Sequence, residues 1–245
     1  MPRIVQISDL HLTEDRSGRA WRTDTWTAFD RVLEALRSED FDRLVLTGDL
    51  ANKPRRATYE RLREALGAAL TSTHLVPGNH DSSVLVREVF GDRLCGDRPT
   101  SNFSASLGEW QLIGLDSTVP RRVHGRISDE QIEWLRGELA EPRPTLLFQH
   151  HPPIRVGTWW LDKDLAPDLR AYSAAVGSST VRGIACGHVH QSHAGTLAGV
   201  PVWTAPSTAY QFPPRGWWPR AASRRSGYRC FELDGDALRT HVVML

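Results

Sequence analysis

The sequence is poor in cysteine, and its cysteines form no recognisable pattern. Only three occur in 245 residues, at Cys95, Cys186 and Cys230, and no two have the CxxC spacing. An odd and scattered set does not make a disulfide framework and is typical of a reducing compartment. We therefore expect a cytoplasmic protein.

Long hydrophobic runs are also missing. No stretch of about 18 consecutive apolar residues occurs, which is the length needed to cross a bilayer. The N-terminal residues enter a strand-like run at once, without a charged leader, an apolar segment and a cleavage site. The sequence thus predicts neither a membrane span nor secretion.

Neither sign of charge dominates the chain. Lys and Arg number 30 against 29 Asp and Glu, which leaves a formal net charge of +1. Such a balance argues against wholesale electrostatic capture of nucleic acid, whereas a small anionic substrate requires no global field. Hydrophobic residues at 40% and charged residues at 24% are ordinary for a globular protein. No linker or repeat is visible, so we expect one domain over residues 1–245.

Short β-branched runs alternate with amphipathic helical stretches, which is the pattern of a layered α/β fold. The expected buried strands are Ile4–Ser8, Leu44–Thr47, His74–Val76, Leu112–Leu115, Leu146–Gln149 and Gly183–Cys186. Apolar spacings of three and four predict helices over residues 24–38, around residues 59–70 and after the capping box Ser128–Gln131, and a further helix is expected over residues 165–176. After His190, short strands joined in part by an Asp234–Gly235 turn are expected to close a second sheet onto the first.

Seven oxygen and nitrogen side chains stand just after these strands. They are Asp9 and His11 in SDLH, Asp49 in TGDL, Asn79 in PGNHD, His150 in FQHHPP, and His188 and His190 in CGHVH. Loops at the carboxyl ends of strands can bring distant residues together. Carboxylate, imidazole and carboxamide ligands suit first-row divalent or trivalent metals, so the set predicts a site for two metal ions.

Each cluster taken alone has a plainer explanation. A Gly-Asp pair or an Asn after Pro-Gly is more often a turn, and an isolated DxH means little. A pair of histidines is usually structural or exposed. Residues two apart on an extended segment point to one side, however, and that spacing occurs in both DxH and HxH. Five clusters that obey one positional rule favour the metal site.

In this order the segments resemble the calcineurin-like metallophosphoesterase superfamily, whose pattern is DxH, GD, GNH[DE], H and GHxH. Within it, the chain resembles class III cyclic nucleotide phosphodiesterases and related glycerophosphodiesterases. The segments LIGLDSTVP, HGRISDEQIEWL, HHPPI and APSTAYQF carry this closer likeness, which runs from Arg3 to about Phe212. The resemblance implies a four-layer α/β/β/α sandwich of two mixed sheets.

The resemblance also implies a ligand scheme. One metal ion would take Asp9, His11, Asp49 and His190, and the other would take Asp49, Asn79, His150 and His188. Asp49 would bridge the two ions and is counted with His80 as catalytic. The family places its ligand at the first histidine of HHPP, which selects His150 over His151. The ions are divalent or of mixed valence, and iron, manganese, zinc and cobalt all suit the ligands.

His80 has a separate role in the implied scheme. In resembling enzymes the histidine of GNHD lies beside the substrate, where it stabilises the phosphate or protonates the leaving alkoxide, and Asp81 is available to orient it. The plainer alternative is a histidine near a helix start that Asp81 caps. A metal-bound hydroxide would attack phosphorus, so that no covalent phosphoenzyme is needed.

We expect a small phosphodiester as the substrate, with 3',5'-cyclic AMP or GMP as the leading class. A glycerophosphodiesterase or a broad phosphodiesterase or phosphomonoesterase is the alternative, and a nuclease or a non-catalytic scaffold is disfavoured. Trp159 and Trp160 are candidates for a nucleobase wall, or for packing. Arg215, Arg220, Arg224 and Arg225 interleave with Trp217 and Trp218 in a stretch that favours a solvated loop, with an anion or a homodimer partner as alternatives.

Overall fold

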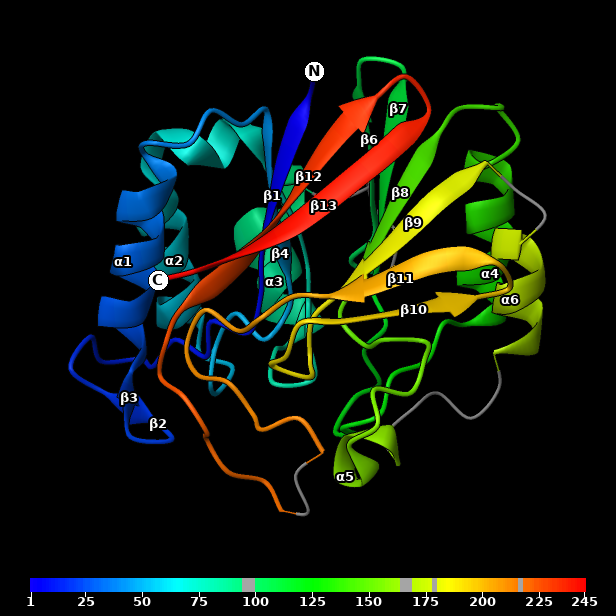
Figure 1. Ribbon diagram of the computed structural model, residues 1–245. Helices are drawn as coiled ribbons and strands as arrows, with labels where there is room; N and C mark the ends of the chain where they lie inside the picture. Colours follow the sequence, from blue (N-terminus) through cyan, green and yellow to red (C-terminus); the bar gives the residue numbers. More distant parts are fainter. Residues whose placement is uncertain (94–99, 164–168, 178–179, 216–217) are drawn as a thin grey trace.

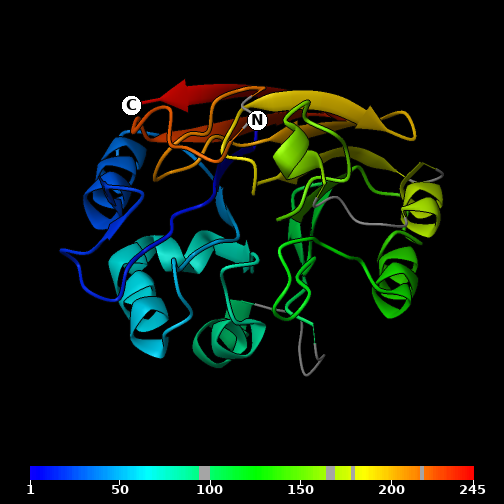
Figure 2. The same ribbon diagram turned by 90° about the horizontal axis from the view of Figure 1, so that it is seen from below.

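The structure is a computed structural model that describes residues 1–93, 100–163, 169–177, 180–215 and 218–245. Two mixed sheets face each other, and helices cover their outer sides (Figure 1, Figure 2). This is the four-layer α/β/β/α sandwich that the family resemblance implied.

The first sheet has the strand order β13-β12-β1-β4-β5. Its parallel part is β1 (Arg3–Ile7), β4 (Arg43–Thr47) and β5 (Thr73–Val76), while β12 (Gly227–Asp234) and β13 (Ala237–Met244) are antiparallel. Three helices pack on its outer face, namely α1 (Thr25–Leu36), α2 (Arg56–Leu66) and α3 (Ser83–Phe90). Short 3-10 helices follow α2 at Gly67–Ser72 and α3 at Gly91–Arg93.

The second sheet has the order β10-β11-β9-β8-β7-β6. Its strands are β6 (Phe103–Leu107), β7 (Trp110–Leu115), β8 (Thr145–Gln149), β9 (Val181–Cys186), β10 (His193–Leu197) and β11 (Val200–Thr204). The helices α4 (Asp129–Glu138) and α6 (Arg170–Gly177) pack on its outer face. A small hairpin of β2 (Arg19–Ala20) and β3 (Thr23–Asp24), and the one-turn helix α5 (Trp159–Asp162), lie at the lower end of the molecule in Figure 1.

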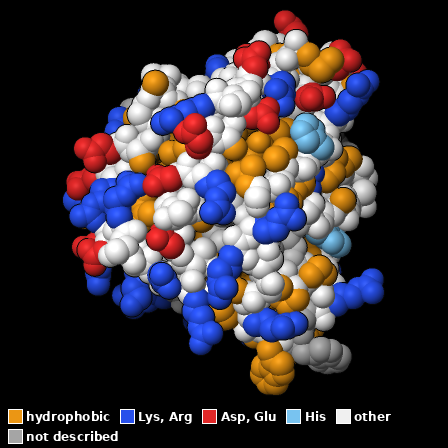
Figure 3. All heavy atoms as spheres, turned by 60° about the vertical axis from the view of Figure 1, so that its left-hand side comes forward, with side chains coloured by type: hydrophobic (Ala, Val, Ile, Leu, Met, Phe, Trp, Pro, Cys, Tyr) orange, Lys and Arg blue, Asp and Glu red, His pale blue; other side chains and the backbone are white. Residues whose placement is uncertain are grey.

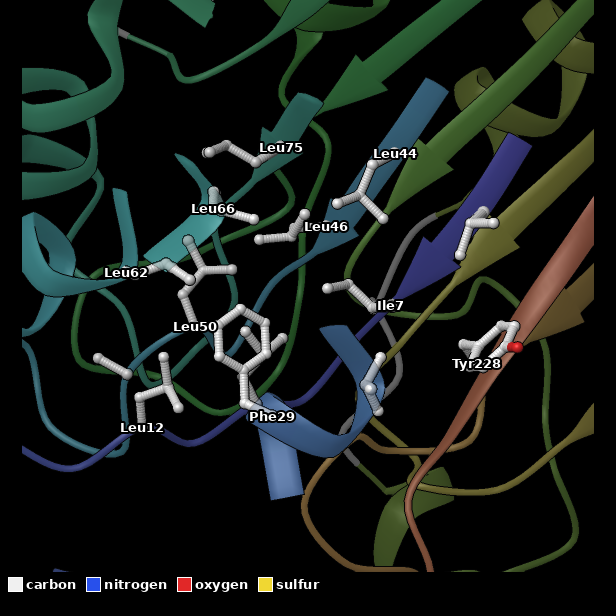
Figure 4. Close-up of a cluster of buried hydrophobic side chains, with 14 of the residues drawn as sticks. Ile7, Leu12, Phe29, Leu44, Leu46, Leu50, Leu62, Leu66, Leu75 and Tyr228 are labelled. Carbon is white, nitrogen blue, oxygen red and sulfur yellow. The ribbon is translucent and has the colours of Figure 1, made fainter. Parts of the chain in front are cut away.

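Alternation along the central strands builds the layers. In β4, Leu44 and Leu46 face the helices, whereas Val45 faces the other sheet. Figure 4 shows Leu44 and Leu46 among side chains of α1 and α2, including Phe29 and Leu62. Successive residues of a strand point to opposite sides, so a run of apolar residues fills two interfaces at once. Each fully buried Leu or Phe contributes about 1.5–3 kcal/mol to stability.

The six predicted strands are all present, each within three residues of its predicted bounds. The helix predicted over residues 24–38 is α1, and the Asp24 side chain caps it by accepting from the Thr27 N–H at 3.0 Å. The capping box is confirmed: the Ser128 and Gln131 side chains each accept from the other's backbone N–H. Of the helix predicted over residues 165–176, residues 164–168 lie outside the described residues, and α6 accounts for the rest.

The prediction for the chain after His190 is wrong in two respects. The four late strands do not form a sheet of their own. β10 and β11 extend the second sheet, whereas β12 and β13 cross to the first and pair beside β1. Each pair therefore completes a sheet that earlier strands began. The turn between β12 and β13 also shifts by one residue, because Asp234 pairs with Ala237 and leaves Gly235 and Asp236 as the loop.

The described part of the chain contains no helix with the length and apolar character that a bilayer crossing requires.

Candidate metal centre

The loops after the central strands are joined to one another by backbone hydrogen bonds. The N–H of Asp9 donates to Gly48 at 3.0 Å, and that of His11 donates to Asp49 at 2.9 Å. Across the second sheet, the Gly187 N–H donates to the His150 carbonyl at 3.0 Å. The ladders of the two sheets thus continue past the strand ends, which fixes these loops before any ligand arrives.

Two glycines let the loops approach closely. A Cβ at Gly78 would lie 2.3 Å from Asp49 Oδ1, and one at Gly187 would lie 2.0 Å from Ser8 Oγ and 3.0 Å from Asp9 Oδ2. No side chain fits at either position. The glycines of PGNHD and CGHVH therefore set the spacing between neighbouring loops.

The backbone at the site is strained. Five of the seven predicted ligands have positive φ although none is glycine, namely Asp9 (54°), His11 (45°), Asp49 (50°), His188 (71°) and His190 (48°). A left-handed conformation costs a non-glycine residue about 1–2 kcal/mol, and such residues gather at functional sites. No feature of the sequence predicted this strain, because the identity of a residue does not by itself indicate a left-handed backbone.

One group of ligand atoms comes from Asp9, His11, Asp49 and His190, all of them buried, and these atoms lie within 4.8 Å of one another. His190 Nε2 lies 3.3 Å from Asp9 Oδ1 and 3.1 Å from His11 Nε2. His11 Nε2 lies 3.6 Å from Asp49 Oδ2. The structure therefore brings together the four residues predicted for the first ion.

A second group surrounds the other oxygen of Asp49. His150 Nε2 lies 3.5 Å from Asp49 Oδ1 and 3.1 Å from Asn79 Oδ1. His188 Nδ1 lies 3.0 Å from the same Asn79 oxygen. The four residues predicted for the second ion are thus also neighbours, and Asp49 stands between the two groups.

Hydrogen bonds at the Nδ1 atoms of two imidazoles determine which ring nitrogen has a lone pair available to a metal ion. His150 Nδ1 donates to the Thr47 carbonyl at 2.8 Å, and His190 Nδ1 donates to the Tyr210 carbonyl at 2.7 Å. A carbonyl can only accept, so in each neutral ring the proton is on Nδ1 and Nε2 has a free lone pair. His150 Nε2 then faces the acceptor oxygen of Asn79 without a proton between them. A cation placed among these lone pairs would relieve the repulsion, so the residues fit a metal ion.

The pKa shifts of the site residues also favour the binding of a metal ion. Burial lowers the pKa of both His11 and His188 to about 3, which keeps these rings neutral near pH 7. Burial opposes ionisation of Asp49, but His150, His80 and His11 outweigh it and hold the pKa of this carboxyl below its usual value. The pKa of Asp9 is likewise lowered, mainly through His190, against the effect of burial. The site therefore presents carboxylates that ionise readily and, at His11 and His188, neutral imidazoles.

His151 belongs to the same cluster but is engaged elsewhere. Its ligand atom lies within 4.8 Å of those of His150 and His188. However, its Nε2 donates to the Val123 carbonyl at 2.9 Å, and its Nδ1 accepts from the Ser117 hydroxyl at 2.8 Å. With both ring nitrogens bonded to protein groups, His151 supports the loop, and this favours His150 as the ligand.

His80 lies at the edge of the centre and is exposed. Its backbone N–H donates to Asp49 Oδ1 at 2.8 Å, and its ring is 4.8 Å from that of His11. The Asp49 carboxylate raises the pKa of His80, and burial only partly opposes this. His80 Nδ1 lies 3.0 Å from the Asn52 carbonyl, to which it donates, so Nε2 is the atom available to a substrate.

The role expected for Asp81 is wrong. Its carboxylate accepts from the backbone N–H groups of Leu50, Ala51 and Gly78 and from the Tyr59 hydroxyl, at 2.9–3.0 Å. The carbonyl of Asn52, and not Asp81, orients the imidazole of His80. Asp81 instead holds the Asp49 loop against the Gly78 turn.

Aromatic rings that sequence reasoning did not assign to the site line one side of it. Tyr210 stacks on His11 with ring centroids 5.3 Å apart, and Phe212 stacks on His190 at 4.4 Å. Both lie in the loop after β11, within the APSTAYQF segment that carried part of the family likeness. The aromatic residues of that segment were the available signal.

The two weaker sequence features have different outcomes. Trp160 packs against Phe212 with centroids 4.9 Å apart, as a packing residue does, whereas Trp159 is 55% exposed. In the Arg-rich stretch, Trp218 is 75% exposed and the four arginines are also exposed, as expected of a solvated loop. Trp217 and Cys95 lie outside the described residues.

Comparison with known proteins gives a consistent result. The model of the calcineurin-like phosphoesterase family matches residues 2–192. The chain is 33% identical over 247 residues to the 3',5'-cyclic adenosine monophosphate phosphodiesterase CpdA of Escherichia coli, a match that covers 98% of this chain and 88% of that protein. It is 30% identical over 243 residues to a 3',5'-cyclic-nucleotide phosphodiesterase of Nostoc, with 97% and 90% covered.

Solved structures share the fold at lower identity. A dimetal phosphatase from Danio rerio superposes with a TM-score of 0.66 at 17% identity, covering 99% of this chain and 98% of that one. A purple acid phosphatase from yellow lupin seeds superposes with a TM-score of 0.72 at 12% identity, covering 99% of this chain and 51% of that one. These two likenesses concern the fold.

Proposed function

Because the chain belongs to the calcineurin-like phosphoesterase family and is a metal-dependent phosphoric diester hydrolase, we propose that it hydrolyses 3',5'-cyclic nucleotides, cyclic AMP or cyclic GMP. The observation that carries the proposal is the convergence of imidazole nitrogen and carboxylate oxygen atoms from buried side chains on the two sides of Asp49. The names of the relatives from Escherichia coli and Nostoc support the substrate class.

We assign the ligands in two sets that share one carboxylate. Asp9, His11, Asp49 and His190 would hold one ion, and Asp49, Asn79, His150 and His188 would hold the other. Iron, manganese, zinc and cobalt all suit such oxygen and nitrogen donors. When bound, a pair of ions lowers the pKa of a coordinated water and neutralises the non-bridging phosphate oxygens.

The protein's own side chains do the remaining work. Asp49 directs one carboxylate oxygen to each group, and its Oδ1 also accepts from the His80 backbone, so the bridge and His80 are positioned together. The Asn52 carbonyl holds the proton of His80 on Nδ1, and the raised pKa allows Nε2 to hold one as well. From Nε2, a proton can be donated to the leaving O3' as the P–O3' bond of the cyclic diester breaks.

The surface charge is consistent with an anionic substrate. In Figure 3, Lys and Arg side chains predominate over the lower part of the face shown, which is the end where the β2–β3 hairpin and the loop after β11 lie in Figure 1. These segments carry the exposed Arg19, Arg22, Arg215 and Arg220. A local positive field raises the encounter rate of a small anion without a large net charge.

A comparison of substrates tests the proposal. The metal-loaded protein is assayed on cyclic AMP, cyclic GMP, 2',3'-cyclic AMP, glycerophosphoethanolamine, an aryl phosphodiester, a phosphomonoester and a short single-stranded oligonucleotide. We expect the highest kcat/KM on cyclic AMP or cyclic GMP, by about 10-fold or more, which is about 1.4 kcal/mol of transition-state discrimination.

The same panel separates the alternatives. If cyclic AMP turns over no faster than the aryl diester, the cyclic nucleotide assignment is wrong and a broad phosphodiesterase remains. Preference for glycerophosphoethanolamine would identify a glycerophosphodiesterase, and preference for the oligonucleotide a nuclease.

A further inference from the structure

The β2–β3 hairpin has a turn that its residues disfavour. Arg19 pairs with Asp24 and Ala20 pairs with Thr23, so that Trp21 and Arg22 alone form the loop. Both have positive φ, 48° and 63°. Two consecutive left-handed residues are typical of a type I' turn, which prefers Asn-Gly because larger side chains crowd the backbone. The surrounding structure therefore holds two bulky residues in a conformation that they would not adopt by themselves.

The Trp21 ring continues the aromatic side of the metal centre outward. Its centroid lies 6.0 Å from that of Tyr210 and 5.9 Å from that of Phe212. Tyr210 and Phe212 in turn stack on His11 and His190. The indole is thus one ring away from two predicted metal ligands.

The indole also keeps a free surface. Trp21 is 46% exposed, although one side of it contacts the aromatic pair. Packing alone does not account for this arrangement, since a ring placed only to fill space would be covered, as Trp26 is at 1% exposure. An exposed indole beside a phosphate-binding centre is the platform on which a nucleobase stacks.

We propose that Trp21 recognises the nucleobase of the substrate by stacking and that the strained Trp21–Arg22 turn holds the indole in place for it. This inference rests on the proposed function, because among the candidate diesters only a nucleotide presents a base. Stacking is tolerant of base identity, so the same residue would serve adenine and guanine. The hairpin would contribute to the affinity for the nucleobase, while the metal ligands and His80 would contribute to hydrolysis of the phosphodiester.

Binding measured by calorimetry on the metal-loaded protein tests the inference. Adenosine 5'-monophosphate is the probe with a base, and inorganic phosphate is the probe without one. We expect Trp21→Ala to raise the Kd of the nucleotide about 10-fold or more, with the Kd of phosphate unchanged. Trp21→Phe should retain most of the nucleotide affinity, because the aromatic face remains.

Two further variants distinguish the effect of the Trp21 indole from the effect of the turn conformation. The double variant Trp21→Asn with Arg22→Gly keeps the type I' turn with its preferred residues but removes the indole, and should lose nucleotide affinity as Trp21→Ala does. Trp218→Ala removes an equally large exposed indole elsewhere and should change neither Kd.

Several outcomes would overturn the inference. One is an equal nucleotide Kd in wild type and Trp21→Ala, and another is nucleotide affinity retained by the double variant. A parallel loss of phosphate binding in Trp21→Ala would assign the residue a structural role and would also overturn it. Failure of the proposed function is seen separately, as failure of the wild type to hydrolyse cyclic nucleotides, and the two Kd values decide the inference in either case.

Discussion

Single hydrogen bonds on the outer side of the imidazoles decide which nitrogens face the centre. Thr47 and Tyr210 accept from the Nδ1 atoms of His150 and His190, so in the neutral rings the lone pairs of both Nε2 atoms face the centre. The sequence predicted the identity of these histidines through spacing and order. It could not predict the partner carbonyls, because a backbone acceptor has no side-chain signature.

The sequence also could not predict the hydrogen-bond partners of Asp81, and this explains why its expected role in orienting His80 is wrong. An aspartate that follows a candidate catalytic histidine suggests an orienting pair, yet tertiary packing gives its carboxylate four other donors. Four charge-assisted hydrogen bonds outweigh one contact to an exposed imidazole. The positive φ angles of five predicted ligands were equally hidden, since they arise from loops joined across the sheets.

The assignment of His80 leads to a residue-scale prediction. His80→Ala should lower kcat on cyclic AMP by about 100-fold or more, the usual contribution of a positioned general acid. The loss should be much smaller on an aryl diester, whose leaving group departs without protonation. Steady-state kinetics on both substrates, with metal analysis of the same samples, measure the effect.

Metal content should remain at the wild-type level in His80→Ala. His241→Ala, which removes an exposed histidine on β13, is the matched control and should leave the kinetics unchanged. Equal losses on the two substrates would contradict the role of His80 as the proton donor.

Among the secondary structure elements, the long apolar strands were predictable and the short hairpin was not. β4 and β8 are runs of consecutive apolar residues that fill both faces of a sheet, and such runs are recognisable from composition. β2 and β3 have two residues each, and their turn lacks the Asn-Gly signal. The contacts of Trp21 with Tyr210 and Phe212, far along the chain, help to hold this hairpin.

The strained turn gives an element-scale prediction. Arg22→Gly should raise the free energy of unfolding by about 0.5–1 kcal/mol, because relief of the left-handed conformation, about 1–2 kcal/mol, exceeds the entropy that glycine loses on folding, about 0.5–1 kcal/mol. Urea denaturation of the wild type and the variant measures this change in the free energy of unfolding.

Arg19→Gly is the control for the lost charge. It removes an exposed arginine from the same hairpin at a position without positive φ, and it should lower stability by about 0.5–1 kcal/mol. Equal destabilisation in the two variants would show that the turn at Arg22 stores no strain.

For the whole molecule, the centre exists only where the two sheets meet. The first sheet supplies Asp9, His11, Asp49 and Asn79, and the second sheet supplies His150, His188 and His190. The Gln6 side chain joins the sheets near this point by donating to Thr47 Oγ1 at 2.8 Å and to the Cys186 carbonyl at 3.0 Å. Neither sheet alone carries all of the ligands that we propose for either ion, so the site assembles only when the two sheets pack together.

The sequence predicted this meeting of loops, because each cluster stands just after a strand, but it did not predict the path of the last strands. Pairing of β12 with β1 depends on contacts between residues more than 200 positions apart, which local patterns do not encode. The single domain over residues 1–245, the cytoplasmic location, the homodimer and the identity of the metals stay predictions.

The central claim is that Asp49 bridges two metal ions. Its most direct test is the metal content per chain of the purified protein, measured by atomic emission for wild type, Asp49→Ala and the exposed control Asp129→Ala. We expect about two equivalents in the wild type and the control, and loss of both together with activity in Asp49→Ala, because one carboxylate serves both sites. Retention of two equivalents and of turnover in Asp49→Ala would contradict the claim.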